Sequence, residues 1–173
     1  MSASHDQPIV NKVATSGLVL LELETLLPDF EITPLDIAPQ LWQGMVLKEK
    51  DFRARVKGHD WSTYTGKHVA VHCSADAIIQ HWAWMLIASA LGPHAAGVHF
   101  GTPESWINAH VLRSIETLDV ESYRDARVIV KGCGKVELDY AAYGTVSLKL
   151  LPVVKTLMYG EPCSTVPVWK RGS

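Results

Sequence analysis

The chain has 173 residues, of which 47% are hydrophobic and 20% are charged, and its formal net charge is -2. A chain of this length buries enough apolar surface to fold without disulfides or a structural metal. We therefore expect one domain over residues 10–173, preceded by a flexible polar tail at residues 1–9. The balanced charge excludes the basic surface that binding to nucleic acids or anionic membranes requires, so neither is an expected partner.

The first residues, MSASHDQPIV, lack the basic and apolar regions of a secretion signal. The longest apolar run, GLVLLEL from Gly17, is too short to span a bilayer. Both observations predict a cytoplasmic protein. In that reducing compartment the three cysteines are expected to be thiols, metal ligands or redox groups rather than disulfides.

Predicted elements begin with a strand over residues 17–27, for which a short helix is the alternative, followed by a turn and a strand within residues 36–47. The charged segment KEKDFRARVKG indicates a surface helix that ends at Gly58. HVAVH predicts the next strand. After it, Ser74 would cap a buried helix over residues 75–91, with Asp76 in its first turn.

The second half continues the alternation. GVHF predicts a strand, and a helix is expected to begin at Pro103 with Thr102 as its cap. ARVIVKGCG predicts another strand, and residues 138–158 indicate a helix that Pro152 kinks or divides. Strands separated by helices of this length predict a single α/β domain with a mainly parallel sheet and helices on both faces.

A short internal repeat supports this organisation. The pattern of Asp, three residues, Tyr, four residues, Val, one residue and Val begins at Asp60 and again at Asp119, an offset of 59. Each copy is expected to form the same strand, loop and helix, with the two strands lying side by side in one doubly wound sheet. The two aspartates themselves are expected to have a turn or capping role.

The repeat places two cysteines at strand ends. Cys73 and Cys133 each follow a repeated strand, at the edge where parallel α/β sheets usually bind ligands. If these strands are neighbours about 4.8 Å apart, the two thiols can approach each other. The segment YGEPCSTVP would then form a loop that brings Cys163 and Glu161 to the same crevice, close to Asp76.

Three interpretations of these cysteines remain open. Three thiolates with one further ligand are a common zinc set, and they also suit an iron-sulfur cluster, although no C-x-x-C motif is present. Alternatively, one cysteine is a nucleophile, with Lys131 beside Cys133 lowering the pKa of its thiol and Cys163 as a resolving thiol. Asp76 or Glu161 would then act on a substrate. The third interpretation is that all three cysteines are inert hydrophobic residues.

The histidines are expected to be packed or solvated: His81, His94, His99 and His110 lie on or near predicted helices and strands. His59 lies on the loop before the first repeated strand. That is the amino end of the strand, opposite the expected crevice. Trp82 and Trp84 are expected to belong to the core.

Several segments resemble one bacterial protein family, domain of unknown function 2480. They are NKVATSGLVLLEL, GMVLKEKDFR, HDWSTYTGKHVAVHCSADAI, VIVKGCG and, above all, VVKTLMYGEPCSTVPVWKR. The resemblance runs from about Asn11 to Arg171 and implies no activity. It does imply a genomic context of iron-sulfur cluster assembly, whose proteins would then be partners.

The resulting prediction is that Cys73, Cys133 and Cys163 bind a metal or an iron-sulfur cluster in an accessory factor of iron-sulfur or sulfur metabolism. A thiol enzyme that uses a cysteine nucleophile or a persulfide is the first alternative. A non-catalytic interaction module is the second. A homo-oligomer is compatible with each of these.

Overall fold

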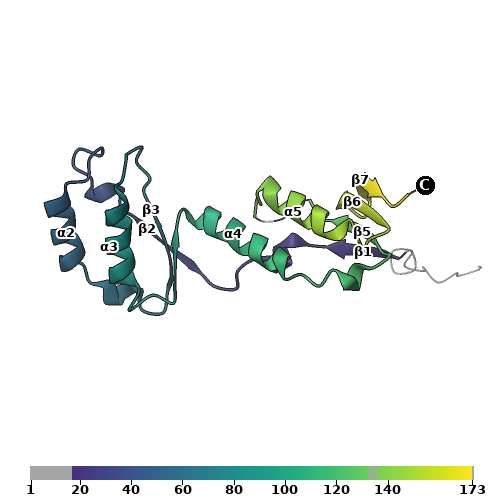
Figure 1. Ribbon diagram of the computed structural model, residues 1–173, viewed down its shortest axis with the longest axis horizontal. Helices are drawn as coiled ribbons and strands as arrows, with labels where there is room; N and C mark the ends of the chain where they lie inside the picture. Colours follow the sequence, from purple (N-terminus) through teal and green to yellow (C-terminus); the bar gives the residue numbers. More distant parts are fainter. Residues whose placement is uncertain (1–16, 133, 135, 173) are drawn as a thin grey trace, which may run out of the picture. The chain divides into compact units, whose positions relative to one another are not determined.

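The computed structural model describes residues 17–132, 134 and 136–172. The expected tail at residues 1–9 and the position of Cys133 therefore lie outside the described residues. The chain divides into two compact units, each described here by itself (Figure 1). We call residues 28–110 the central unit, and residues 1–27 with 111–173 the terminal unit.

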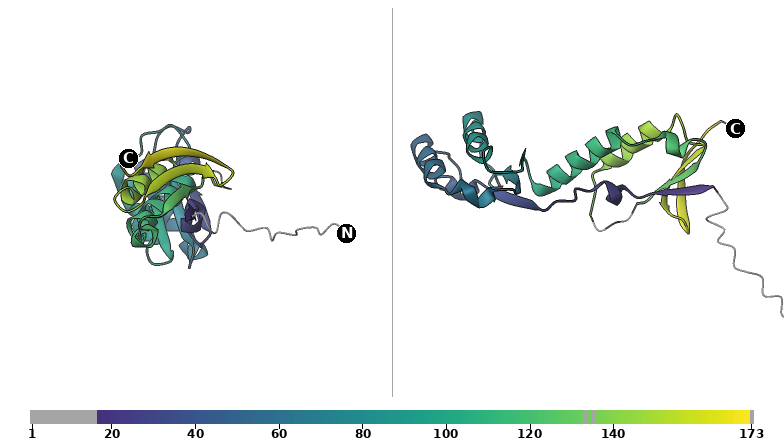
Figure 2. Two further views of the ribbon diagram at one scale, coloured as in Figure 1. Left: turned by 90° about the vertical axis from the view of Figure 1, so that its right-hand side faces the viewer. Right: turned by 90° about the horizontal axis from the view of Figure 1, so that it is seen from below.

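The central unit contains a three-stranded parallel sheet with the order β2-β3-β4. The elements in chain order are β2 (Ile32–Asp36), η2 (Ala38–Gln40), α2 (Glu49–Gly58), η3 (Trp61–Tyr64), β3 (His68–His72), α3 (His81–Leu91) and β4 (Gly97–Phe100). Helices α2 and α3 lie side by side (Figures 1 and 2), and their Phe52 and Trp82 rings meet at 5.9 Å.

The core of the central unit forms where these two helices cover one face of the sheet. Phe52 and Ile87 pack in one cluster with Val69 and Val71 of β3. Because side chains alternate along a strand, His68 faces the opposite side. There it stacks on Phe30 at 3.7 Å and lies 5.7 Å from the Trp106 ring. This sheet therefore has helical residues on both faces, as the sequence predicts.

The terminal unit contains a four-stranded sheet with the order β1-β5-β6-β7, in which only β7 is antiparallel. The elements are β1 (Leu18–Leu21), η1 (Leu23–Leu26), α4 (Pro103–Glu116, which belongs to this unit from Val111 on), η4 (Glu121–Tyr123), β5 (Arg127–Val130), α5 (Tyr140–Leu150), β6 (Thr156–Glu161) and β7 (Ser164–Lys170). Thr102 caps α4 by accepting a hydrogen bond from the Ser105 N–H at 3.2 Å, as expected.

The internal repeat is structural and extends well beyond the four matched residues. At the same offset of 59, α3 corresponds to α5, and the start of β4 to the start of β6. The buried positions correspond too: Phe52 with Val111, Val56 with Ile115, Ala83 with Ala142, Ile87 with Val146 and Leu91 with Leu150. Each unit is therefore one copy of a β-α-β-α-β arrangement, with the central copy inserted in the chain between β1 and α4.

Loop hydrogen bonds follow the same correspondence. Gly66 N–H donates to the His94 carbonyl at 3.0 Å, and Asp125 N–H donates to the Val153 carbonyl at 2.9 Å. Asp60 and Asp119 each accept a backbone N–H at 3.1 Å, from Ser62 and Glu121, at the start of η3 and η4. The turn or capping role expected for the two aspartates is confirmed.

The α/β class and the mainly parallel pairing are confirmed, but the prediction that the repeated strands are neighbours is wrong. β3 pairs with β2 and β4, and β5 pairs with β1 and β6, so the two strands belong to different sheets. Each copy pairs its middle strand with its own flanking strands. The expected domain over residues 10–173 is thus built from two compact units.

Two predicted helices have different bounds. The helix expected over residues 75–91 begins only at His81. Residues 73–80 form no helix: they bend at residues 75 and 76 and are otherwise without regular structure, with alternate side chains partly buried. Ser74 does not cap α3, because its N–H and hydroxyl donate to Asp36. The helix expected over residues 138–158 ends at Leu150, and the chain then turns through Pro152 into β6.

No helix within the described ranges is long and apolar enough to cross a membrane.

Candidate functional site

The carboxyl ends of β3 and β4 border an open groove of about 610 Å³ in the central unit. The extended segment after β3 forms one wall, because Cys73, Ala75, Ala77 and Ile79 all point to the same side of it. The other lining residues are Val71, His72, Trp84, Phe100, Gly101 and Thr102. The groove is therefore mainly apolar, at the edge where parallel α/β sheets usually bind ligands.

Cys73 is half-buried in the wall of this groove. Its Sγ lies 3.6 Å from the Ala75 carbonyl oxygen, to which the thiol donates a hydrogen bond. Trp84 and Phe100 meet edge to face at 6.1 Å at the same groove. The thiol is thus accessible from a space that is large enough for a small molecule.

Asp76 is exposed and does not line the groove. The prediction that it lies in the first turn of a helix is wrong, because α3 begins only at His81 and Asp76 lies in a bend. Among the residues that the structure describes, no carboxylate lines this groove.

The terminal unit has its own carboxyl edge, where β1, β5 and β6 end. Lys131, after β5, donates a hydrogen bond to Glu22 at 3.1 Å, and this contact raises the pKa of the lysine, with Glu161 and Glu24 adding to the effect. Lys131 forms an ion pair with Glu22, and this carboxylate offsets the charge with which the lysine was expected to lower the pKa of a neighbouring thiol. Glu161 is half-buried and is the last residue of β6, so it belongs to a strand and not to the loop that the sequence predicted.

Cys163 is exposed in the two-residue turn between β6 and β7. YGEPCSTVP is therefore part of a β-hairpin rather than a free loop laid across a crevice, and Glu161 pairs with Ser164 across the turn. Figure 2 shows this hairpin in yellow. Cys163 thus lies at the carboxyl edge of the terminal sheet, whereas Cys73 lies at that of the central sheet.

The glycines on either side of Cys133 each lie close to a side chain of the terminal unit. A Cβ atom on Gly132 would collide with the Tyr159 ring, and one on Gly134 would collide with the Glu24 carboxylate. The Tyr159 hydroxyl also donates a hydrogen bond to the Gly132 carbonyl at 3.2 Å. Both glycines therefore pack against the strand-end region of the terminal unit.

The three-cysteine site stays a prediction, because Cys133 lies outside the described residues. The site was predicted because two cysteines were expected at the edge of one sheet. Cys73 and Cys163 instead belong to different compact units. In the described part of the chain, no group of three His, Cys, Asp or Glu side chains could hold a metal ion.

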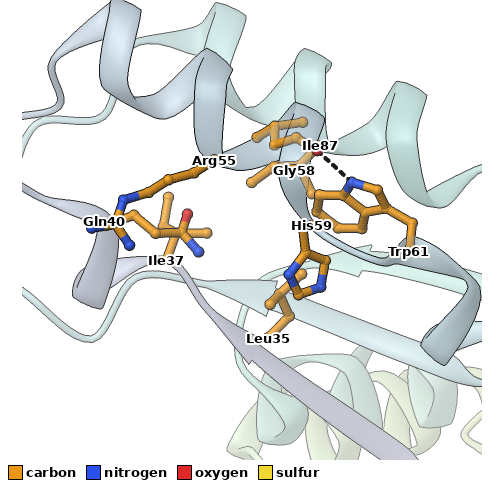
Figure 3. Close-up of a pocket in the computed structure, with 9 residues that line it drawn as sticks. Leu35, Ile37, Gln40, Arg55, Gly58, His59, Trp61 and Ile87 are labelled. Atoms are coloured by element: carbon orange, nitrogen blue, oxygen red, sulfur yellow. Dashed lines mark hydrogen bonds between the residues drawn. The ribbon is translucent and has the colours of Figure 1, made fainter.

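A second pocket, of about 340 Å³, lies between α2 and the end of β2 in the central unit (Figure 3). Its lining includes Arg55, Gln40, His59 and Trp61. His59 does lie on the loop before the amino end of β3, as expected, but nothing in the sequence indicated this pocket. His59 follows the last turn of α2 in an extended conformation, so helical spacing does not join it to Arg55.

Comparison with known proteins gives one match. A family model described as Protein of unknown function (DUF2480) matches residues 7–171. No curated protein and no solved structure matches the chain. The matched residues include those at the carboxyl edges of both sheets. The description of the family gives no activity for either edge.

Proposed function

The chain belongs to the DUF2480 family of proteins of unknown function, and from this premise we propose that it is a cytoplasmic thiol protein of sulfur metabolism. In this proposal Cys73 is the reactive group, and the groove at the carboxyl ends of β3 and β4 receives the sulfur donor. The observation that carries the proposal is the position of Cys73 in the wall of an open, mainly apolar groove.

The chemistry suited to this groove is the transfer of a sulfane sulfur. The thiolate of Cys73 attacks the outer sulfur of a small persulfide, R–S–SH, and a new S–S bond forms on Cys73. The S–S bond of the donor breaks, and R–S⁻ leaves with the electron pair. A sulfane sulfur is apolar and polarisable, so Ala75, Ala77 and Ile79 offer it a suitable surface.

The half-burial of Cys73 also favours this role over that of an ordinary surface thiol. A persulfide on an exposed cysteine is open to attack by any other thiol. In this proposal the open groove admits a small donor, and the half-buried position of Cys73 slows attack by thiols on large proteins. Cys163 lacks this protection because it is exposed in the β6–β7 turn.

The experiment is to treat the reduced protein anaerobically with cysteine persulfide and to measure its mass. We expect a gain of one sulfur atom at Cys73 that is absent from Cys73→Ser and retained in Cys163→Ser, the matched control. Glutathione should remove this sulfur more slowly than it removes one from Cys163. Equal sulfur uptake by wild type and Cys73→Ser would contradict the proposal.

A second candidate function is the binding of zinc or an iron-sulfur cluster, as an accessory factor that works with iron-sulfur assembly proteins. The close packing of Gly132 and Gly134 around Cys133 favours it, because it holds the flanks of that cysteine in the unit that also carries Cys163. A homo-oligomer could supply further ligands, since four are usual.

This candidate is tested by anaerobic purification, an absorption spectrum, and measurement of zinc and iron. Metal that is lost from Cys133→Ser and from Cys163→Ser but kept by Cys73→Ser would support a site in the terminal unit. Loss from all three variants would support the original three-cysteine site. Protein that binds neither zinc nor iron after anaerobic reconstitution would contradict both.

A further inference from the structure

The pocket between α2 and β2 has one cationic, hydrogen-bonding end. In Figure 3 the Arg55 guanidinium and the Gln40 amide lie next to each other at this end. Within the described ranges, neither side chain has an ion-pair or hydrogen-bond partner, and no carboxylate lines the pocket. An arginine fork and an amide N–H₂ group are donors that fit the two oxygens of a carboxylate.

The other end of the pocket is aromatic and held in place. The Trp61 Nε1–H donates to the Val56 carbonyl at 2.7 Å, which fixes the indole against the end of α2. The His59 ring lies 4.6 Å from the Trp61 ring and 5.7 Å from the Tyr64 ring. Such a wall, set before any ligand arrives, lowers the entropic cost of binding.

Leu35, Ile37 and Ile87 supply apolar side chains to the lining, which we call the apolar floor; in Figure 3 Ile37 lies beside Gln40 and Leu35 beside His59. The volume of about 340 Å³ falls within the range of about 300–1,000 Å³ that is usual for small-molecule sites. The pocket thus offers a cation, a flat wall and an apolar floor in a space of suitable size.

The internal repeat shows which of these residues the fold itself requires. The buried Val56 and Ile87 have buried apolar counterparts in the terminal unit, Ile115 and Val146. The pocket groups do not: the counterparts of Arg55, His59 and Trp61 are Ser114, Leu118 and Val120. The same β-α-β-α-β arrangement therefore forms in the terminal unit with other residues at these three positions, although in the central unit Trp61 also packs against the core.

We propose that this pocket binds a small aromatic carboxylate. The carboxylate accepts hydrogen bonds from Arg55 and Gln40, and the ring lies on the apolar floor against His59 and Trp61. This site is separate from the Cys73 groove, with which it shares no lining residue.

The test uses the whole chain and benzoate as the probe, followed by two-dimensional ¹H–¹⁵N NMR. Benzoate should shift the Trp61 indole signal and the backbone signals of α2, with saturation in the millimolar range or below. Benzamide has the same ring without the charge and should bind about tenfold more weakly, which is the usual value of a charged over a neutral hydrogen bond. Acetate, which lacks the ring, should also bind more weakly.

The matched variants are Arg55→Gln and Lys57→Gln, which each remove one positive charge from an exposed position in the last turn of α2. We expect Arg55→Gln to weaken benzoate binding about tenfold and to remove the preference over benzamide, and Lys57→Gln to change neither. Arg55→Lys, which keeps the charge but not the planar fork, should lie between wild type and Arg55→Gln.

Three results would overturn the proposal. They are no binding of benzoate in the millimolar range, shifts that map outside the pocket, and an equal loss of affinity in Arg55→Gln and Lys57→Gln. The last result would mean that the helix attracts anions by its general charge only. The spectrum of each variant without ligand shows whether the variant is folded.

Discussion

At the scale of single residues, Gly160 has the most demanding backbone position in the terminal sheet. Its φ is +118°, which side chains other than hydrogen rarely allow, and a Cβ atom there would lie 2.5 Å from the Ser164 carbonyl oxygen. Because that oxygen belongs to the backbone of the paired strand, it cannot move aside. We expect Gly160→Ala to lower the free energy of unfolding by about 1–3 kcal/mol in urea denaturation followed by circular dichroism.

The control for this prediction is Gly144→Ala in the interior of α5. A Cβ atom on Gly144 would meet nothing within 4 Å, and alanine favours the helix by about 0.5–1 kcal/mol over glycine. This variant should therefore be more stable than wild type. A loss of stability in both variants, or in neither, would contradict the assignment of strain to Gly160.

Residue-scale reasoning succeeded where it depended on short-range chemistry. The close approach at Gly132 and Gly134 and the cap at Thr102 were predictable, because each follows from one residue type and its immediate neighbours. The neighbourhood of Asp76 was not, because it depends on where a helix begins. The expected cap, Ser74, instead donates hydrogen bonds to Asp36, which lies far away in the sequence.

At the scale of elements, α2, α4, β3, β4 and β5 were predictable from periodicity, whereas β2 and β7 were missed and the strand expected within residues 36–47 does not form. The two errors in helix bounds have physical causes. Residues 73–80 contain alanines and isoleucines, which suit a buried helix. From Cys73 to Ala77 apolar and polar residues nevertheless alternate, which does not suit a helix, although Ile78 interrupts this pattern. Residues 156–161 form a strand because parallel pairing with β5 outweighs the local pattern.

The segment after β3 contacts Asp36 at the end of β2. Burial alone would raise the pKa of Asp36. Hydrogen bonds from the Ser74 hydroxyl and from the backbone N–H groups of Ala38 and Ser74 outweigh it and lower the pKa below the usual value of 3.8. The ionised carboxylate therefore joins β2 to the wall of the Cys73 groove.

Because the pKa of Asp36 is lower in the folded state, its stabilising effect is complete above about pH 4 and is lost as the pH falls through the folded value. We expect Asp36→Asn to lower the free energy of unfolding by about 1 kcal/mol at pH 7 and to reduce its decline below pH 4. Alkylation of Cys73 by a neutral maleimide should also become faster, because the groove wall is less restrained. Unchanged stability curves and an unchanged alkylation rate would contradict this role of Asp36.

At the scale of the whole molecule, the division into two sheets could not be predicted from local patterns. The short repeat correctly indicated two copies of one arrangement. Its strands were wrongly expected in one sheet, because the first strand of the terminal copy, β1, lies before the entire central copy in the chain. The pairing of two strands so far apart in the chain cannot be detected from the periodicity of either strand. The cysteines were therefore assigned to the carboxyl edge of one sheet instead of to two sheets.

Two separate copies of the same arrangement should respond separately to damage in their cores. Leu91 and Leu150 occupy equivalent positions at the ends of α3 and α5, and both are 0% exposed. Replacing either with alanine should lower the free energy of unfolding by about 2–5 kcal/mol. Local opening then becomes more frequent around the cavity. In hydrogen exchange followed by mass spectrometry, Leu91→Ala should accelerate exchange within residues 28–110, and Leu150→Ala within residues 111–172. The two variants control for each other, since they remove the same side chain from the same place in each copy.

Faster exchange across both ranges in both variants would show that the two cores open as one cooperative structure, contrary to this prediction.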